Sequence, residues 1–459
     1  MEWSPARRRR NTLMLGAIAP LLLVGVGVAV FLNRDRERRC EDAEGMRKLA
    51  LLSLPGPAPA ANADWPQWRG PNRDGVSPET SLRTDWSPGG PRVLWKQVIG
   101  RGFSSVAIVG TRLFTTEEET IASPDGEATG TGHEAVVCRD VRSGAEVWRF
   151  HYPNDYSERF GSGPRSTPAV DGDRIYAVGP TGIFHCLRAD TGERLWRHDL
   201  LEEFHGRTMQ YGVSFSPLVE GDLVYATPGG PDGNAVVAFD KVSGRVVWKA
   251  LDDPMGYSSP IAVTAAGVRQ LLVLTNEALV SLSPTDGKVY WRYPWKTANG
   301  FNIATPLAFG DYVLISSAYG KGCALLEIAA ERDGSLCARR VYEHNRLRNY
   351  FASSIRWGNH LYGFDEKDLV CMDLHTGVEA WREKGIRSFG KGSLLAAAGH
   401  LIVLGESGTL WLIEATPAGY REKASCRVST NKCWTVPVLA DGKLYVRDES
   451  HLVCLDVRN

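Results

Sequence analysis

Two stretches of this chain repeat one pattern, and that pattern decides the fold. The first runs from Ser166-Thr-Pro-Ala-Val-Asp-Gly-Asp-Arg-Ile-Tyr176 to Asp190-Thr-Gly-Glu-Arg-Leu-Trp196. The second runs from Ser216-Pro-Leu-Val-Glu-Gly-Asp-Leu-Val-Tyr225 to Ser243-Gly-Arg-Val-Val-Trp248. Each copy contains a small residue with Pro, short apolar runs separated by Gly-Asp and Gly turns, and a closing Trp. This pattern predicts four short strands per copy.

The closing Gly-x-x-x-Trp recurs at Gly144/Trp148, Gly192/Trp196, Gly244/Trp248, Gly287/Trp291 and Gly377/Trp381. Gly supplies the positive φ that a tight hairpin turn requires. Trp then enters the outermost strand of the copy, where we expect its ring to pack against the next copy. With Trp95 included, the predicted structural tryptophans are Trp95, Trp148, Trp196, Trp248, Trp291 and Trp381.

The spacing of these tryptophans predicts the number of copies. Successive positions are separated by 53, 48, 52, 43 and 90 residues, and the last interval contains a degenerate copy at Gly334 to Ala338. A step of roughly 48 residues is typical of a four-stranded propeller blade. The chain after Trp381 holds one full blade at 390–429 and three strands at 434–456. We therefore expect Pro91 to Val98 to supply the missing strand, which closes the ring and removes exposed sheet edges.

These observations predict an all-β, eight-bladed β-propeller over residues 64–459. The residues before it divide into a basic tail at 1–12, a transmembrane segment at 13–32 and a linker at 33–63. Leu13 to Leu32 is free of charge and follows Arg7 to Arg10, so we interpret it as a single-pass signal anchor. The positive-inside rule then places the tail in the cytoplasm and the propeller on the periplasmic side of a bacterial inner membrane, although basic residues at 34–39 oppose this orientation.

A second interpretation starts translation at Met46. The apolar run Leu49 to Leu54 and the sequence Ala61-Asn62-Ala63 then form a short secretory signal, and the propeller is secreted to the periplasm. Both interpretations export the propeller.

The formal charge of the chain excludes one class of partner. The net charge is +0, and residues 1–48 hold ten Lys and Arg against six Asp and Glu, which leaves 43 basic and 47 acidic residues in the remainder. The propeller therefore lacks the basic stripe that nucleic-acid binding requires. We expect a monomeric body that contacts the membrane through its N-terminal helix.

The repeats Ala/Cys-x-Asp-x-x-Thr-Gly-x-x-x-Trp resemble the quinoprotein, or PQQ-type, repeat over roughly residues 93–459. Within that superfamily the chain is most similar to the PQQ-binding-like propeller proteins that are compared with the assembly factor BamB. The segment from Asp64-Trp-Pro-Gln-Trp-Arg-Gly-Pro-Asn-Arg to Ser77 resembles the opening of exported propellers of planctomycete-like bacteria. This resemblance implies the fold, but no single activity.

The resemblance raises the question of quinone chemistry. Quinoprotein alcohol dehydrogenases hold pyrroloquinoline quinone (PQQ) between a Trp and a disulfide of adjacent cysteines, beside a Ca²⁺ bound by carboxylate and amide oxygens. The nine cysteines of this chain include no adjacent pair. Cys138, Cys186, Cys371 and Cys454 share one repeat position with Ala238, which predicts buried residues of an inner strand. Cys426 and Cys433 flank a blade junction, and whether they form a disulfide stays open.

Other catalytic signatures are missing from the sequence as well. His133-Glu134 lacks the second His of a zinc protease, and neither a Gly-x-Ser-x-Gly elbow nor a phosphate loop occurs. We therefore predict no catalytic, cofactor-binding or metal-binding residue.

The loops that lead from one outermost strand to the next innermost strand emerge on one face of a propeller. Here they predict an aromatic and basic ring around the channel. Its members are Phe103, Phe160, Arg165, Tyr211, Phe215, Tyr257, Phe301, Tyr350, Phe351, Phe389, Lys391 and Trp434. Aromatic residues and Arg most often anchor interfaces, so this ring is the candidate binding face. The alternative is that these side chains fill the channel as part of the scaffold.

Two hypotheses follow. The first is a non-catalytic, BamB-like recognition scaffold for an envelope protein or peptide, with no cofactor. The second is a PQQ- and Ca²⁺-dependent alcohol dehydrogenase of the polyvinyl-alcohol type with a divergent pocket.

Overall fold

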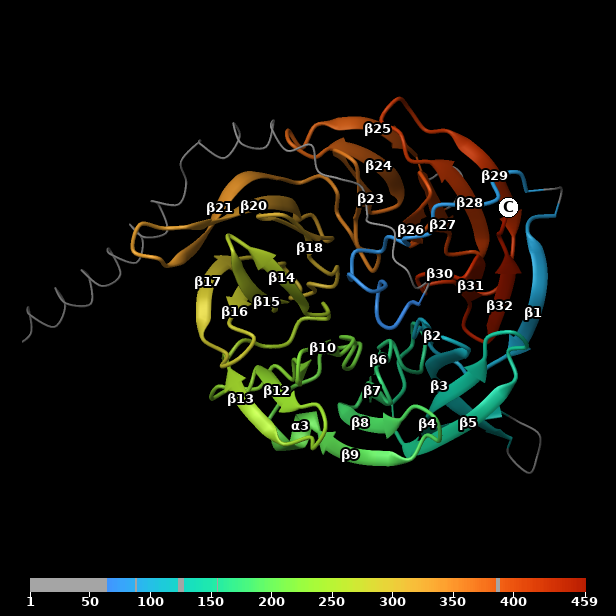
Figure 1. Cartoon of the computed structure of the whole chain (residues 1–459), viewed down its shortest axis with the longest axis horizontal. Coiled ribbons are helices and arrows are strands. Elements are labelled where there is room, and N and C mark those ends of the chain that lie inside the picture. Colours follow the sequence, from blue (N-terminus) through green and yellow to red (C-terminus); the bar gives the residue numbers. More distant parts are fainter. Residues whose placement is uncertain (1–63, 87–88, 123–127, 155, 385–388) are drawn as a thin grey trace, which may run out of the picture. The chain divides into compact units, whose positions relative to one another are not determined.

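The computed structural model describes residues 64–459 apart from 87–88, 123–127, 155 and 385–388. Within these residues, 32 strands form eight four-stranded antiparallel sheets that follow one another around a ring (Figure 1). The prediction of an all-β, eight-bladed propeller is therefore confirmed. No helix of the described part is long and apolar enough to cross a membrane. The predicted transmembrane segment at 13–32 lies outside the described residues.

The first four blades follow the chain in order, each from its inner to its outer strand. Blade 1 contains β2 (Ala107–Val109), β3 (Arg112–Ala122), β4 (Ala128–Asp140) and β5 (Glu146–Pro153). Blade 2 contains β6 (Ala169–Asp171), β7 (Arg174–Val178), β8 (Ile183–Arg188) and β9 (Arg194–Asp199), and the short helix α3 (Leu200–Glu203) follows it. Blade 3 contains β10 (Leu218–Glu220), β11 (Leu223–Ala226), β12 (Val236–Asp240) and β13 (Val246–Ala250). Blade 4 contains β14 (Ile261–Ala265), β15 (Val268–Leu274), β16 (Ala278–Leu282) and β17 (Val289–Pro294).

The remaining blades complete the ring. Blade 5 contains β18 (Leu307–Phe309), β19 (Tyr312–Ser317), β20 (Gly322–Ala330) and β21 (Leu336–His344). Blade 6 contains β22 (Ile355–Trp357), β23 (His360–Asp365), β24 (Asp368–Asp373) and β25 (Glu379–Glu383). Blade 7 contains β26 (Ser393–Ala397), β27 (His400–Leu404), β28 (Thr409–Glu414) and β29 (Glu422–Arg427). Blade 8 contains β30 (Val438–Ala440), β31 (Lys443–Arg447), β32 (His451–Asp456) and, from the other end of the propeller, β1 (Arg92–Val98).

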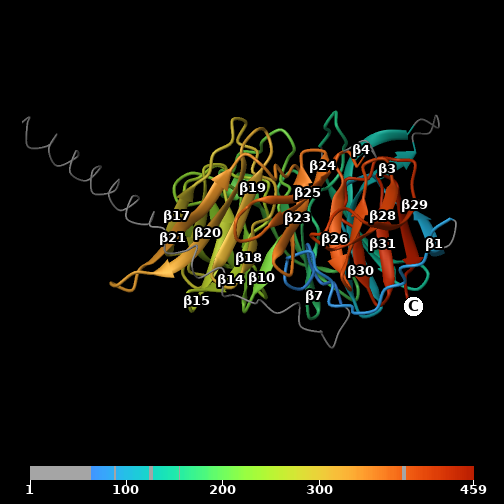
Figure 2. The ribbon, with the colours of Figure 1, turned by 90° about the horizontal axis from the view of Figure 1, so that it is seen from above.

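Strand β1 closes the ring, as its sequence predicts. It pairs antiparallel with β32, with Arg92 opposite Asp456 and Val98 opposite His451. β1 lies beside the C-terminal strands in both views (Figures 1 and 2). Blade 8 therefore has the same four-stranded order as the other blades, and β1, as its outermost strand, covers the edge of β32.

Five blade tryptophans, at 95, 148, 196, 248 and 381, donate a hydrogen bond from the indole N–H to the next blade, whereas that of Trp291 goes to Gln270 of its own blade. Trp148 of β5 lies opposite Cys138 of β4, and its indole N–H donates a hydrogen bond to Ala189 O of blade 2 at 3.0 Å. Gly192 has a φ of 75°, and a Cβ at this position would lie 2.6 Å from the Trp148 ring. The Gly-x-x-x-Trp pattern thus serves two needs, because its Gly forms the turn and also makes room for the Trp of the preceding blade.

The small residues opposite these tryptophans lie on the third strand of each blade, not on an inner strand as we expected. They are Cys138, Cys186, Ala238, Ser281, Cys371 and Cys454, opposite Trp148, Trp196, Trp248, Trp291, Trp381 and Trp95. All six are buried. They are small because a larger side chain at these positions would displace the indole opposite. The eight cysteines that the structure describes are free, including Cys426 and Cys433.

Blade 5 differs from the degenerate copy expected at Gly334 to Ala338. Tyr342, farther along β21, occupies the place of the blade Trp: its hydroxyl donates to Leu374 O of blade 6 at 3.3 Å. A Cβ on Gly377 would lie 3.2 Å from its ring. Both strands of this hairpin have nine residues. The β-bulge that comes just before the Trp in other blades lies here at Leu325/Leu326, opposite Arg340 and Tyr342, and so comes just before Tyr342.

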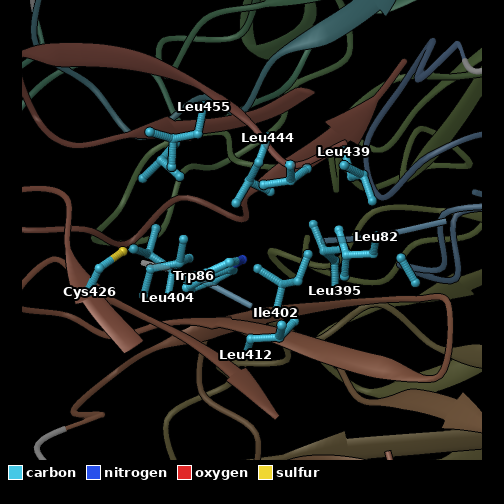
Figure 3. Packing of buried hydrophobic residues seen from close by; sticks show 14 of the residues in the cluster. Leu82, Trp86, Leu395, Ile402, Leu404, Leu412, Cys426, Leu439, Leu444 and Leu455 are labelled. Atoms are coloured by element: carbon cyan, nitrogen blue, oxygen red, sulfur yellow. The ribbon is translucent and has the colours of Figure 1, made fainter. Parts of the chain in front are cut away.

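Blade 7 also lacks its own Trp, and Ala424 stands in that place, opposite Leu412. The indole of Trp86, from the chain before β1, fills the space instead and is 8% exposed. Figure 3 shows Trp86 among Leu404, Leu412, Cys426 and Leu455, between the sheets of blades 7 and 8. A segment outside the repeats therefore replaces a side chain that the repeat has lost.

Trp86 belongs to the N-terminal arm, residues 64–91, which contacts all eight blades. Arm residues hydrogen-bond, blade by blade, to Ile108, Val170, Ser216, Pro260, Thr305, Ser353, Ala396 and Gly442. Arg69 and Arg73 make the central contacts. Arg69 donates to Ser353 O at 3.0 Å and Ser354 O at 2.8 Å, and Arg73 donates to Pro260 O at 2.5 Å. The arm thus crosses the centre of the ring (Figure 1).

A polar cluster is buried between blades 1 and 2. The Tyr152 hydroxyl donates to Glu134 Oε2 at 2.7 Å, and Glu134 Oε1 has no hydrogen-bond partner. Burial raises the pKa of Glu134 to about 8. His185 packs its ring 4.7 Å from that of Tyr152, and burial lowers its pKa to about 3. The cluster therefore holds a protonated carboxyl and a neutral imidazole at neutral pH.

Removing the arm together with β1, up to Val98, should abolish cooperative unfolding and cause aggregation. The deletion exposes the edge of β32 and removes the hydrogen bonds that join the blades at the centre. Size-exclusion chromatography and thermal unfolding measure both effects. A monomeric product with an unchanged melting temperature would contradict the closure by β1.

The substitution Glu134→Gln should stabilise the protein at high pH. Because the folded pKa is raised, the stability that the neutral carboxyl contributes is complete below about pH 4.5 and is lost as the pH rises through about 8. We expect the variant to match the wild type at pH 5 and to exceed it by more than about 1 kcal/mol at pH 9. Urea unfolding at the two pH values measures this, and an equal difference at both would be the opposite result.

Candidate functional site

The loops that precede the inner strands converge on a cavity at the centre of the ring. Each of the eight blades contributes at least one lining residue, and Trp68 of the arm lines it as well. The cavity holds about 1040 Å³ of space, part of which is open to solvent. Because Trp68, Arg69 and Arg73 cross the ring beneath it, the arm forms the floor of this central cavity.

The structure brings most of the predicted ring together at this cavity. The lining includes Phe103, Phe160, Arg165, Tyr211, Tyr257, Phe351, Lys391 and Trp434. Phe301 and Tyr350 are not among the lining residues, but their rings contact those of Tyr211 and Phe351. Phe215 and Phe389 are fully buried in the core, where Phe389 packs 4.8 Å from Trp411.

The aromatic rings form a belt along most of the cavity wall, with a gap between Phe103 and Tyr211. In one half of the belt, the ring centroids of Phe103, Trp434 and Phe351 follow one another at 5.2 and 5.1 Å. In the other half, successive centroids lie 5.2–5.6 Å apart, in the order Tyr350, Tyr319, Phe301 and Tyr257. Phe351 and Tyr350 join the two halves at 6.1 Å. Tyr211 continues the belt at 5.6 Å from Tyr257. Tilted and edge-to-face contacts of this kind hold the rings in place, so the belt is a rigid apolar wall.

Sequence reasoning missed Tyr319, which links Tyr350 to Phe301 in the belt. It lies in the turn between β19 and β20, with a φ of 58°, and therefore outside the loops that the repeat pattern identifies. The turns between second and third strands emerge on the same face, and this geometry is the signal by which it could have been found. Trp68 was missed because the arm lies outside the repeats.

Three cations lie over the rings of the belt. The Arg165 guanidinium is 5.6 Å from the centroid of Phe103 and 6.0 Å from that of Tyr211, and so bridges the gap between them. Lys391 Nζ lies 5.3 Å from the Phe351 centroid and 5.4 Å from that of Trp434. Lys432 Nζ lies 4.5 Å from the Trp434 centroid and pairs with Glu449 at 3.2 Å. Arg165 and Lys391 form no ion pair with a carboxylate of the described residues, so the rings stabilise their charge instead, whereas Lys432 has both a ring and a carboxylate partner.

Hydroxyl groups near the floor join neighbouring blades. Ser216 Oγ accepts the N–H of Thr167 at 2.9 Å, and Ser259 Oγ accepts the N–H of Ser216 at 2.9 Å. Thr305 Oγ1 accepts the indole N–H of Trp68 at 2.9 Å. The Ser or Thr that begins each repeat copy thus has a structural role. Its hydroxyl oxygen accepts a hydrogen bond from a backbone N–H of the preceding blade.

The floor and its surroundings hold buried guanidinium groups. Burial lowers the pKa of Arg69 to about 10 and that of Arg73 to about 9, so both remain cationic at neutral pH. Arg447 is equally buried, with a pKa of about 10. Within the described chain, the hydrogen bonds of all three go to carbonyl, hydroxyl or amide oxygens, and none goes to a carboxylate.

This lining does not fit PQQ with Ca²⁺. Ca²⁺ takes carboxylate, amide and carbonyl oxygens, whereas no Asp, Glu, Asn or Gln lines the cavity in the part of the chain that the structure describes. The same part contains no group of three His, Cys, Asp or Glu side chains that could hold a metal ion. Trp68 supplies a flat floor, but the sequence has no adjacent cysteine pair, and the calcium ligands of a quinone site have no counterpart among the described lining residues.

Comparisons with known proteins agree with the fold and identify the family. A polyvinylalcohol dehydrogenase from Pseudomonas sp is 23% identical over 185 residues, which cover 34% of this chain and 26% of that protein. Among solved structures, BamB from Moraxella catarrhalis has a TM-score of 0.54 at 13% identity and covers 78% of this chain and 97% of its own. A europium-containing methanol dehydrogenase has a TM-score of 0.58 at 14% identity, with 87% and 91% covered. At these identities the structures show the fold alone.

The sequence relationship to BamB is more extensive. The outer membrane protein assembly factor BamB from Yersinia pestis is 26% identical over 362 residues, which cover 76% of this chain and 85% of that protein. The family model described as outer membrane protein assembly factor BamB matches residues 132–383, more than half of the chain. The chain therefore belongs to the BamB family of PQQ-type β-propellers.

Proposed function

We propose that this protein is a non-catalytic propeller scaffold of the cell envelope that binds a protein or peptide in its central cavity. Family membership supports the scaffold, because the family model and the relative from Yersinia pestis are both described as outer membrane protein assembly factor BamB. The uncharged stretch from Leu13 to Leu32 supports anchoring in the inner membrane, with the propeller on the periplasmic side. Secretion from a start at Met46 is the alternative location.

One observation carries the proposed site: the aromatic belt with Arg165 and Lys391 over its rings. Large aromatic side chains and Arg are the residues that dominate binding energies at protein interfaces. In this belt they are held by their neighbours rather than by a ligand, so little conformational entropy is lost on binding. Both cations also lie on loops, and their replacement leaves the strands of the blades untouched.

A second candidate is an alcohol dehydrogenase of the polyvinyl-alcohol type. The short similarity to the Pseudomonas enzyme and the shared propeller fold favour it. The described lining opposes it, because it offers no carboxylate to accept the proton that an alcohol loses on oxidation. The scaffold is therefore the function that the geometry supports best.

The double substitution Arg165→Gln and Lys391→Gln should abolish capture of the partner while leaving the fold intact. Neither side chain is buried, so the free energy of unfolding should change by less than about 1 kcal/mol. Capture from solubilised envelope fractions, with the bound protein identified by mass spectrometry, measures binding. Lys288→Gln, in an exposed turn of blade 4, is the matched control. Undiminished capture of the same protein by the double variant would place the site elsewhere.

The purified propeller should show neither Ca²⁺-dependent binding of PQQ nor reduction of a dye with alcohols. The reason is that no side-chain carboxylate or amide oxygen occurs among the described residues that line the cavity. Calorimetric titration with and without Ca²⁺, together with a dye-reduction assay, tests this. Saturable, Ca²⁺-dependent binding in the micromolar range or tighter would favour the dehydrogenase.

A further inference from the structure

We propose that a second cavity, on the opposite side of the arm from the central cavity, binds a neutral mono- or disaccharide. This cavity holds about 860 Å³ of space, part of which is open to solvent. It is lined by arm residues 67 and 71–74 and by the innermost strands β10, β14 and β18 of blades 3, 4 and 5. Three features of these described residues support the proposal: the free edges of the strands, the arrangement of those edges and the balance of charge.

The buried guanidinium of Arg73 separates the two cavities. It donates hydrogen bonds to Ser216 O of blade 3 and Pro260 O of blade 4. Ser216 lines the central cavity, whereas the residues from Leu218 and Ile261 onward line the second cavity. The second cavity is therefore a separate site, and it goes beyond the proposed function.

The innermost strands of blades 3 to 5 present free main-chain groups to this cavity. Each of these strands ends in a two-residue turn that is closed by a hydrogen-bonded pair. Because pairing in an antiparallel hairpin alternates, every second residue before that pair directs its N–H and C=O away from the second strand. Val219, Ala262 and Ala308 are such residues, and each lines the cavity. No hydrogen bond joins these groups to another part of the described chain.

The same repeat position binds the arm in other blades. In blades 1, 2 and 7 it is occupied by Ile108, Val170 and Ala396. Their N–H groups donate to main-chain oxygens of the arm at 2.8, 2.8 and 2.9 Å. The arm thus satisfies the innermost strands of those blades and leaves those of blades 3 to 5 facing the cavity. The cavity therefore offers both donors and acceptors to a ligand.

The arrangement of these groups favours a compact ligand over an extended one. Successive blades follow one another around the ring, so the edges of β10, β14 and β18 lie on an arc and not along a line (Figure 1). A polypeptide strand could pair with only one of them. The hydroxyl groups of a sugar radiate in several directions, and each can donate to a C=O and accept from an N–H. A sugar ring can therefore meet three blades at once.

The side chains of the lining agree with a neutral, polar ligand. The described lining contains two acidic and two basic residues, and Arg269 Nε binds Glu220 Oε1 at 2.7 Å. The exposed side-chain amide of Asn72 forms no hydrogen bond with the described residues and supplies a further donor and acceptor. The half-buried side chains of Val219 and Val263 give apolar surface to the C–H groups of a sugar.

The test follows main-chain amides by NMR in the full chain, isotopically labelled at Ala and Val, during titration with maltose, cellobiose or N,N′-diacetylchitobiose. We expect at least one sugar to shift the signals of Val219, Ala262 and Ala308 saturably, with a Kd of about 1 mM or tighter. The signals of Val170 and Ala396 should not move, because the arm already binds these N–H groups. Absence of a saturable shift with all three sugars would overturn the proposal.

The substitution Asn72→Ala should weaken the binding of that sugar at least about fivefold, because the ligand loses hydrogen bonds to the amide. Asn72 is exposed, so the melting temperature should not change. Asn359→Ala, in an exposed turn of blade 6 outside the described lining, is the matched control and should keep the wild-type affinity. Equal affinities of the two variants would contradict the site.

A different ligand class and a failure of the proposed function give separate results. An acetylated and amidated peptide Thr-Val-Thr-Val that shifts the three amides, when no sugar does, would assign the cavity to strand addition and overturn the sugar. Partner capture depends on Arg165 and Lys391, which lie on the other side of the arm. Asn72→Ala should therefore leave capture unchanged, and its loss would contradict the separation of the two cavities.

Discussion

The hydrogen bonds from Arg69 and Arg73 to main-chain carbonyls at the centre of the ring are the interaction on which the rest of the structure depends. Each blade packs on two neighbours, so a propeller has no core shared by all of its blades. The inner loops leave carbonyl oxygens pointing at the axis, and a planar guanidinium can meet carbonyls of several blades at once. By bridging them, the arm fixes the loops that carry the central cavity and makes its floor.

Most of the fold could be predicted from the sequence because it repeats. The Gly-x-x-x-Trp spacing indicates blades, and the isolated strand at Pro91 to Val98 indicates how the ring closes. What could not be predicted are the places where the repeat has decayed. Tyr342 replaces the Trp of blade 5 because the β-bulge of this blade lies farther along β21 than the repeat pattern predicts. Trp86 fills the site beside Ala424, although the two residues are more than 300 positions apart in the sequence. Such compensation depends on contacts distant in sequence, which a local pattern does not report.

The candidate site was predictable in part for the same reason. Loop position placed Arg165, Lys391 and Trp434 on one face, but it did not separate the buried Phe389 from the exposed Phe160, because both precede an inner strand. Burial within a loop depends on how the neighbouring blade packs. The floor was not predictable at all, since nothing in the Trp-Arg-Gly-Pro-Asn-Arg motif reveals that its two guanidinium groups lie at the axis.

Closure by β1 also sets the order in which the protein can form. Arg92 and its partner Asp456 are 364 residues apart, so synthesis delivers the first strand of the propeller long before the last. The blades in between can form from local hairpins as the chain emerges, but the final sheet has to wait for the C-terminus. A contact of this sequence separation forms slowly, and once formed it must break before the ring can open. The same pairing that delays folding therefore gives the closed propeller kinetic stability.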